Sequence, residues 1–226
     1  MSTITIPALP SSASLLQRVR EQGIWLMCSL TAAALLAVAA FLPLWGMTFQ
    51  APQYPQGLQL TAYGTKLEGD LEEVNMLNHY VGVAPVEPDD IRELELFPYT
   101  IVALLAVVVF GGLFARSRLL RAAAAASVWL FILGFLLDIQ WWLYRAGHDL
   151  NPEAPIRVDE FTARVFGTTK VVNFYSDAAA GPGLWLILSA AVLLTAGPAV
   201  MRFLYASWQN TGGPDRSAQR APGIGR

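Results

Sequence analysis

The sequence of 226 residues contains one cysteine, two histidines and few charged side chains. A single cysteine excludes an internal disulfide, a CxxC redox pair, a cysteine-rich zinc site and a CxxCH haem attachment within the chain. Both histidines, His79 and His148, lie outside the long apolar runs, which excludes a bis-histidine haem held between membrane helices. Charged residues make up 14% of the chain. Soluble domains carry about 25%, so the composition predicts a membrane protein.

Four apolar stretches are long enough to cross a bilayer, which takes about 20 helical residues. These stretches cover residues 24–47, 97–115, 122–144 and 183–206. Inside them, the charged residues are Asp138 in the third stretch and Arg202 near the end of the fourth. The sequence therefore predicts an all-α membrane protein, with a four-helix transmembrane domain over residues 24–206.

The charges are sorted between the two sides of this predicted membrane domain. One side carries nine bases and two acids, and the other carries six bases and fourteen acids. Since lysine and arginine are retained on the cytoplasmic side, both termini are expected inside, in a bacterial cytoplasmic membrane. Residues 1–23 then form a cytoplasmic segment, and residues 207–226, rich in Gly, Pro, Ser and Arg, form a disordered cytoplasmic tail.

The N-terminal region also resembles a cleavable secretory signal. Arg18 and Arg20 precede the apolar run, and the small residues 37–39 resemble a cleavage site. The run continues to Leu44 and ends on Trp45, which is too long for a typical signal. This length favours an uncleaved first helix.

Two long loops, residues 48–96 and 145–182, are expected on the extracytoplasmic side. In the first loop, residues 58–63 alternate weakly between apolar and polar side chains and predict a short strand. Asp70 with Glu73 three residues later resembles a capping box, which predicts a short helix from there to about Tyr80 or Val81.

The two loops are expected to form one small cap, because each is too short and too polar to bury a core alone. Residues 166–175 of the second loop loosely echo residues 63–66 and 74–80 of the first. A helix, outer loop and helix used twice would give a two-fold internal pseudo-repeat. Unrelated loops are the alternative.

One face of the short predicted helix collects possible metal ligands. At 100° per residue, Glu72, Met76 and His79 fall opposite the apolar arc. A thioether and an imidazole suit Cu(I), and Glu72 could orient the histidine. His148 in the other loop is a candidate third ligand, so Cu(I) is the one cofactor that the residues suggest.

The same residues have a structural interpretation. Asn75, Asn78 and His79 are side chains that commonly hydrogen-bond to loop backbone, and they could hold the cap together, with Tyr80 as a neighbouring interaction residue. The sequence leaves the metal site and the hydrogen-bonded turn as alternatives.

Asp138 is the acidic residue within the third apolar stretch. An acid in a membrane span is costly and is by default a functional candidate, here as a proton or ion site. The alternative is a structural pair with Arg145, which lies seven residues later on the same helix face.

Three segments, residues 51–58, 68–82 and 147–156, resemble a family of bacterial four-helix membrane proteins. The outer loops of that family carry an APQYP-type and an N-x-LNHY-type motif. The resemblance covers most of the chain apart from the two termini. It implies a place beside maturation and electron-supply components of nitrous oxide reductase, a periplasmic copper enzyme.

The leading hypothesis is therefore a non-catalytic accessory protein that engages a periplasmic copper-enzyme system through its outer cap. The alternative is a small structural subunit of a membrane redox or transport complex. An enzyme is not expected, because no Ser/His/Asp, Cys/His or paired-carboxylate arrangement can be identified in the sequence. The expected partners are the lipid bilayer and periplasmic or membrane proteins, without nucleic acid.

Overall fold

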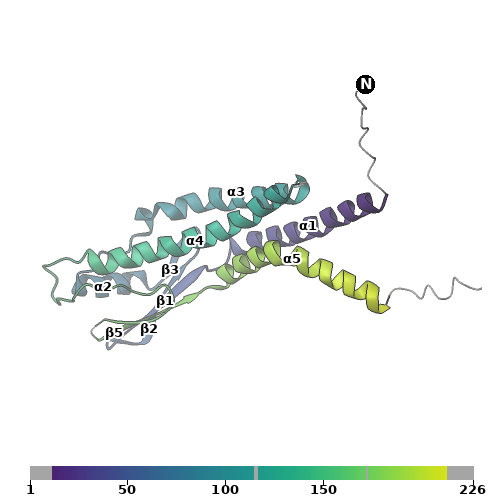
Figure 1. The fold of residues 1–226 in the computed structure, drawn as a ribbon. Helices are drawn as coiled ribbons and strands as arrows, with labels where there is room; N and C mark the ends of the chain where they lie inside the picture. Colours follow the sequence, from purple (N-terminus) through teal and green to yellow (C-terminus); the bar gives the residue numbers. More distant parts are fainter. Residues whose placement is uncertain (1–11, 115–116, 172, 213–226) are drawn as a thin grey trace, which may run out of the picture.

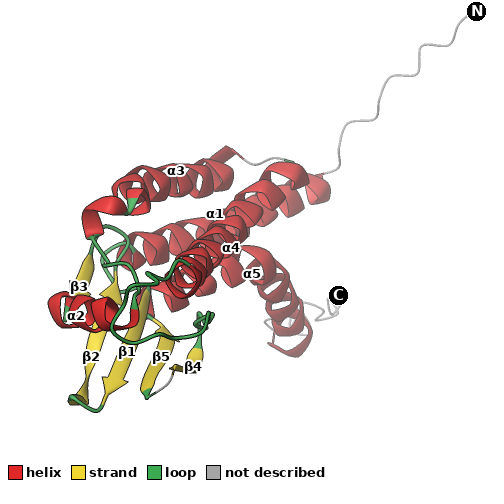
Figure 2. Cartoon of the chain, turned by 90° about the vertical axis from the view of Figure 1, so that its left-hand side faces the viewer, coloured by secondary structure: helices red, strands yellow, loops and turns green. Residues whose placement is uncertain are grey.

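The computed structural model of the chain describes residues 12–114, 117–171 and 173–212 (Figure 1). Four long helices lie side by side, and a sheet extends from one end of them (Figures 1 and 2). The elements follow in the order α1 (Ser12–Ala39), β1 (Trp45–Ala51), β2 (Tyr54–Ala62), β3 (Leu67–Gly69), α2 (Leu71–Val81), η1 (Pro88–Asp90), α3 (Arg92–Phe114), α4 (Arg118–His148), β4 (Gly167–Val171), β5 (Phe174–Ala180) and α5 (Pro182–Gly212).

The four long helices form a bundle. Each is long and apolar enough to cross a membrane, which indicates a membrane protein. Helix α1 packs against α3 and α5, and α4 closes the bundle against the same two helices. The largest fully buried side chains of the bundle are Leu36, Val108, Val128, Ile187 and Leu194. Large apolar side chains such as Phe110 and Leu130 are exposed on its outer surface, where a bilayer would cover them.

The prediction of an all-α fold class is wrong, because the segments between the helices form a five-stranded antiparallel sheet. Its strand order is β3-β2-β1-β5-β4. Helix α1 ends at Ala39, before the predicted end at residue 47, and Trp45 and Met47 are buried on β1 instead. These alternating apolar residues follow soon after an apolar helix. In the sequence the two elements therefore form one continuous apolar run, which was interpreted as a single helix.

The sheet joins the two segments between the long helices, which the sequence predicts to form one cap. Strand β1 from the first segment pairs with β5 from the second, with Trp45 opposite Ala180 and Gln50 opposite Tyr175. The prediction of a two-fold pseudo-repeat is wrong, because β1 directly follows α1 whereas β5 directly precedes α5. Within the described residues, α2 has no counterpart in the second segment.

Helix α2 begins and ends where the sequence predicts, but the Asp70 side chain does not cap the helix as the expected capping box requires. The Asp70 carboxylate accepts a hydrogen bond from the Gln59 N–H at 2.8 Å, and it makes no side-chain cap bond. Asp70 thus ties the start of α2 to strand β2. The helix ends at Gly82, whose φ of 81° is left-handed and whose N–H donates to the Asn78 carbonyl.

Helix α4 links the bundle to the sheet. Its 31 residues extend about 46 Å, longer than the hydrocarbon core of about 30 Å. Phe135 packs against both the bundle core and the sheet core, whereas Ile139 and Leu143 pack against the sheet core. Beyond Phe135, α4 therefore runs along the sheet, as Figure 1 shows.

The terminal helices extend further than the predicted membrane domain. Helix α1 begins at Ser12, inside the predicted N-terminal segment 1–23. Helix α5 continues to Gly212, so residues 207–212 of the predicted disordered tail are helical. The remainder of that tail, residues 213–226, lies outside the described residues.

Candidate functional site

A cavity of about 720 Å³ lies where the sheet meets the helix bundle. Its walls are a face of the sheet, helix α2, residues 83–94 leading into α3, and the C-terminal half of α4. We call it the junction cavity, and its lining includes the apolar side chains of Trp45, Met47, Leu77, Phe135, Ile139 and Leu143. Small-molecule sites typically enclose about 300–1,000 Å³ of mainly apolar surface with a few polar groups, which this cavity resembles.

Helix α2 forms one wall because its apolar residues share one face. Val74, Leu77, Asn78 and Val81 line the junction cavity, and Val74 is 2% exposed. Their spacing of three and four residues is the period of a helix face. The apolar arc expected from the sequence therefore packs toward the sheet and α4.

A second wall, residues 83–94, is attached to α2 through Asn75. The Asn75 side-chain nitrogen donates to the Val86 carbonyl at 3.2 Å, and its side-chain oxygen accepts from the Val86 N–H at 2.7 Å. These two bonds satisfy both backbone groups of Val86. Asn75 thus has the structural role that the sequence offered as the alternative to a metal site.

The C-terminal end of α2 is attached to the segment that follows α4. The Asn151 N–H donates to the Gly82 carbonyl at 2.8 Å, and the Ile156 N–H donates to the Tyr80 carbonyl at 2.9 Å. A Cβ atom at Gly82 would lie 2.8 Å from the Asn151 carbonyl oxygen. Close backbone approach and a left-handed φ therefore both favour glycine at this position.

Residues 161–165 connect α4 to the sheet beside the cavity. The Trp45 indole nitrogen donates to the Val165 carbonyl at 2.7 Å, and the Phe161 N–H donates to the Gly147 carbonyl at 3.1 Å. A Cβ atom at Gly147 would lie 1.9 Å from the Phe161 carbonyl oxygen. The absence of a side chain at Gly147 thus permits this contact.

The charged lining of the junction cavity is mainly acidic. Its acidic residues are Glu87, Asp89, Asp90, Glu93, Asp138 and Asp149. Its basic residues, among those described, are Arg92 and Arg145. Because acids outnumber bases, the lining favours positive over negative charge.

Asp138 lies in the wall of this cavity, one turn beyond Phe135 on α4. Glu93 at the start of α3 lines the same cavity. Arg145 instead lies 3.7 Å from Asp149, and its guanidinium carbon is 5.6 Å from the centre of the Trp142 ring. The structure thus places Asp138 and Arg145 in the same cavity but with different charged neighbours.

Trp142 contributes a further polar group to the lining. Its indole nitrogen is buried and has no hydrogen-bond partner among the described residues. A buried N–H donor without an acceptor is costly. Trp142 was not among the site residues predicted from the sequence.

The predicted copper ligands of α2 lie on the face away from the junction cavity. Met76 is 57% exposed, and His79 and Glu72 are also exposed. Met76 and His79 share the outer face of the helix as the spacing predicts. Among the described residues, no group of three or more His, Cys, Asp or Glu could hold a metal ion. That search does not test a site containing methionine, so the Cu(I) site stays a prediction.

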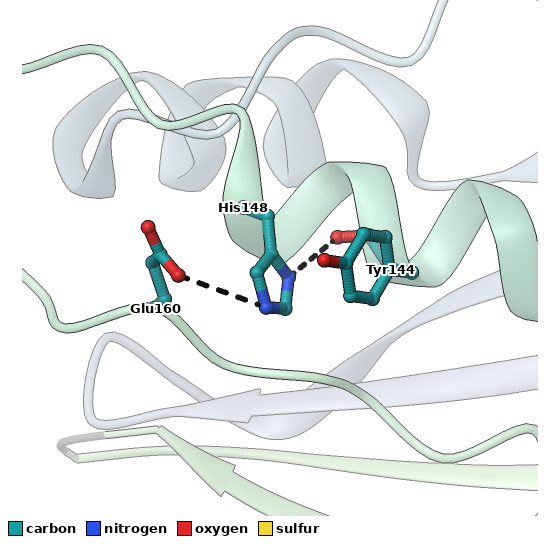
Figure 3. Close-up of polar contacts among 3 residues, drawn as sticks. All are labelled: Tyr144, His148 and Glu160. Carbon is teal, nitrogen blue, oxygen red and sulfur yellow. Dashed lines mark hydrogen bonds and ion pairs between the residues drawn. The ribbon is translucent and has the colours of Figure 1, made fainter.

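His148, the predicted third ligand, lies at the C-terminal end of α4 (Figure 3). Its Nδ1 lies 2.9 Å from the Tyr144 carbonyl oxygen, and its ring stacks on the Tyr144 ring at a centroid distance of 3.9 Å. Because a carbonyl only accepts, Nδ1 carries the proton. Nε2 faces the Glu160 carboxylate at 3.8 Å, so His148 has its own local partners.

Sequence reasoning missed the junction cavity because its walls come from distant segments. Trp45, which lines it, is hydrogen-bonded to Val165, 120 residues later in the chain. The available signal was the alternation of apolar residues, at Trp45, Met47 and Phe49 on β1 and at Leu58, Leu60 and Ala62 on β2. No protein-family model matches the chain, and no curated protein is similar enough to be identified as a relative.

Proposed function

We propose that the chain is a non-catalytic membrane accessory protein that presents its sheet and α2 on the extracytoplasmic side. The observation that carries this proposal is that both inter-helical segments fold into one unit at one end of the bundle, joined by the pairing of β1 with β5. A folded unit of this kind offers a defined surface to a partner, which separate loops would not.

The charge distribution supports the orientation. Arg20, Arg118, Arg121 and Arg202 lie toward the bundle end away from the sheet, whereas the acidic cavity lining lies at the sheet end. The positive-inside rule assigns the arginine-rich end to the cytoplasm. The sheet and α2 then lie on the periplasmic side of a bacterial cytoplasmic membrane.

We propose a nitrous oxide reductase-type copper enzyme system as the partner. The resemblance of residues 51–58, 68–82 and 147–156 to the family with APQYP and N-x-LNHY motifs supports this setting. The exposed face of α2, with Met76 and His79, is compatible with weak Cu(I) binding.

Deletion of the gene in its bacterial host tests this setting. Nitrous oxide reduction is expected to fall while the reductase polypeptide is still produced, and wild-type complementation is expected to restore it. A deletion strain with full activity and full copper content in the reductase would contradict the proposal.

Photocrosslinking from the exposed face of α2 tests the partner surface. A photoreactive amino acid at Met76 or Tyr80 is expected to capture a periplasmic protein, because both side chains are exposed at the sheet end. The same group at Phe110, on the outer surface of the bundle, is the matched control. Equal capture from all three positions would contradict a specific surface on α2.

A second candidate function is a small structural subunit of a membrane redox or transport complex. The position of Asp138 in a cavity at the end of the bundle favours it, because such an acid could face a proton path. Purification in mild detergent distinguishes the two functions. Stable co-purification of quinone-linked subunits supports the second, and recovery of copper-enzyme maturation proteins supports the first.

A further inference from the structure

We propose that the junction cavity binds a membrane-soluble amphiphile with an apolar chain and a protonated amine head. This inference goes beyond the proposed accessory function, since it requires no partner protein. It rests on three observations: the apolar lining, the place of the cavity at the end of the bundle, and the acidic residues on its walls.

The apolar lining suits a hydrocarbon chain. Met47 on β1, Leu77 on α2, and Ile139 and Leu143 on α4 contribute to it from three sides. Contact with such side chains removes an apolar chain from water, which is the dominant favourable term in binding of this kind. The polar groups are few relative to this apolar surface. They therefore determine which head group binds, whereas the apolar lining binds the hydrocarbon chain.

The cavity begins where the bundle ends. Phe135 lines it and also packs against the cores of both the bundle and the sheet. Leu94 on α3 is a second lining residue from a helix that is long and apolar enough to cross a membrane. A molecule dissolved in the bilayer is therefore already at the level of the cavity, so the source of the ligand is the membrane.

The charged residues select a cationic head. Glu93 on α3 and Asp138 on α4 come from two different helices and both line the cavity. A cation in the cavity is attracted by both carboxylates, whereas a fatty-acid carboxylate is repelled by them. Arg145 is occupied by Asp149 at 3.7 Å, so it offers little compensation to an anionic head.

Photolabelling of the full-length protein tests the site. The probe is hexadecylamine carrying a diazirine on its chain, incorporated into phosphatidylcholine nanodiscs with the purified protein. Labelled peptides are expected from the cavity-lining parts of α2 and α4. Labelling confined to outward-facing bundle residues such as Phe110 and Leu130 would overturn the proposal.

Competition for labelling of the wild-type protein tests which head group the cavity prefers. Unlabelled hexadecylamine is expected to compete about tenfold better than hexadecanoic acid or hexadecanol, because close charge pairs favour the cation. Equal competition by the three compounds, or stronger competition by the acid or the alcohol, would overturn the amine assignment. This measurement uses no variant and does not depend on how a substitution folds.

Paired variants locate the effect. Leu77→Trp places a large side chain in the cavity and is expected to reduce cavity labelling, whereas Met76→Trp, on the exposed face of the same helix, is expected to leave it unchanged.

Glu93→Gln with Asp138→Asn is expected to remove the preference for the amine. Glu72→Gln with Asp159→Asn, two exposed acids outside the lining, is the charge-matched control. Retention of the preference in the Glu93 and Asp138 variant would contradict the proposed head site.

Discussion

The four-helix bundle and the sheet region bury apolar side chains by different means. The bundle packs small and aliphatic residues between helices whose backbone hydrogen bonds are internal, with Leu36 and Ile187 fully buried. The sheet region depends on pairing between strands far apart in the chain and on side-chain bonds from Trp45 and Asn75 to loop carbonyls. Loss of a side-chain hydrogen bond should therefore destabilise the sheet region more than the bundle.

The largest effect is expected from a side chain at Gly147. Gly147→Ala places a Cβ atom 1.9 Å from the Phe161 carbonyl oxygen, which should destabilise the sheet region by about 3 kcal/mol. Limited proteolysis in nanodiscs is expected to show faster cleavage in residues 145–182 while the bundle helices stay protected. Gly134→Ala, on the same helix with nothing within 4 Å, is the matched control. Equal cleavage of both variants would contradict the packing at Gly147.

Loss of the Asn75 bonds should be next in size. Asn75→Ala removes two hydrogen bonds to Val86, at a cost of about 2 kcal/mol. Amide hydrogen exchange is expected to accelerate at Val86 and around η1, because this segment loses its attachment to α2. Glu72→Ala on the exposed face of α2 serves as the control. Unchanged exchange at Val86 in the Asn75→Ala variant would contradict the attachment of this segment to α2 through Asn75.

A smaller loss is expected from Trp45→Phe, which keeps the aromatic ring and removes the bond to the Val165 carbonyl. Its cost should be about 1 kcal/mol, measured as a lower denaturant midpoint for the sheet region. Trp129→Phe in the bundle, where the tryptophan is exposed, should leave the midpoint unchanged. A similar decrease for both substitutions would remove the distinction between the two regions.

The smallest effect is expected at the exposed pair of Lys66 and Glu68. The ammonium of Lys66 hydrogen-bonds to the Glu68 carboxylate and lowers its pKa. A lowered folded-state pKa contributes stability above the unfolded-state pKa that is lost as pH falls through the folded-state pKa. Solvent screening keeps this contribution small.

Lys66→Ala should therefore raise the pKa of Glu68 toward its ordinary value without a detectable change in unfolding. Carboxyl NMR titration of Glu68 measures the first effect, and thermal unfolding measures the second. An unchanged Glu68 pKa in the variant would contradict the pairing.

The parts predicted from the sequence are those governed by local rules. Four apolar runs of sufficient length identify the long helices, and the residues from Asp70 to Gly82 give the bounds of α2. One strand was predicted, because residues 58–62 of the expected strand lie in β2. The rest of the sheet could not be predicted, because β1 follows an apolar helix and pairs with β5, whose residues come more than a hundred positions later. The helix face that carries Met76 and His79 follows from periodicity, whereas the cavity beside Asp138 depends on long-range pairing.

The pairing of β1 with β5 joins the two inter-helical segments into one folded unit. In a Cys28→Ser background, Gln50→Cys with Tyr175→Cys places two cysteines at directly paired, exposed positions. Gln50→Cys with Asp177→Cys is the off-register control, because Asp177 pairs with Thr48.

Paired Cα atoms of adjacent antiparallel strands lie within disulfide range, whereas diagonal ones are farther apart. An oxidant added to the protein in nanodiscs should crosslink the first pair rapidly and the second pair slowly. Absence of crosslinking in the first pair, or equal rates for both, would contradict the sheet that joins the two segments.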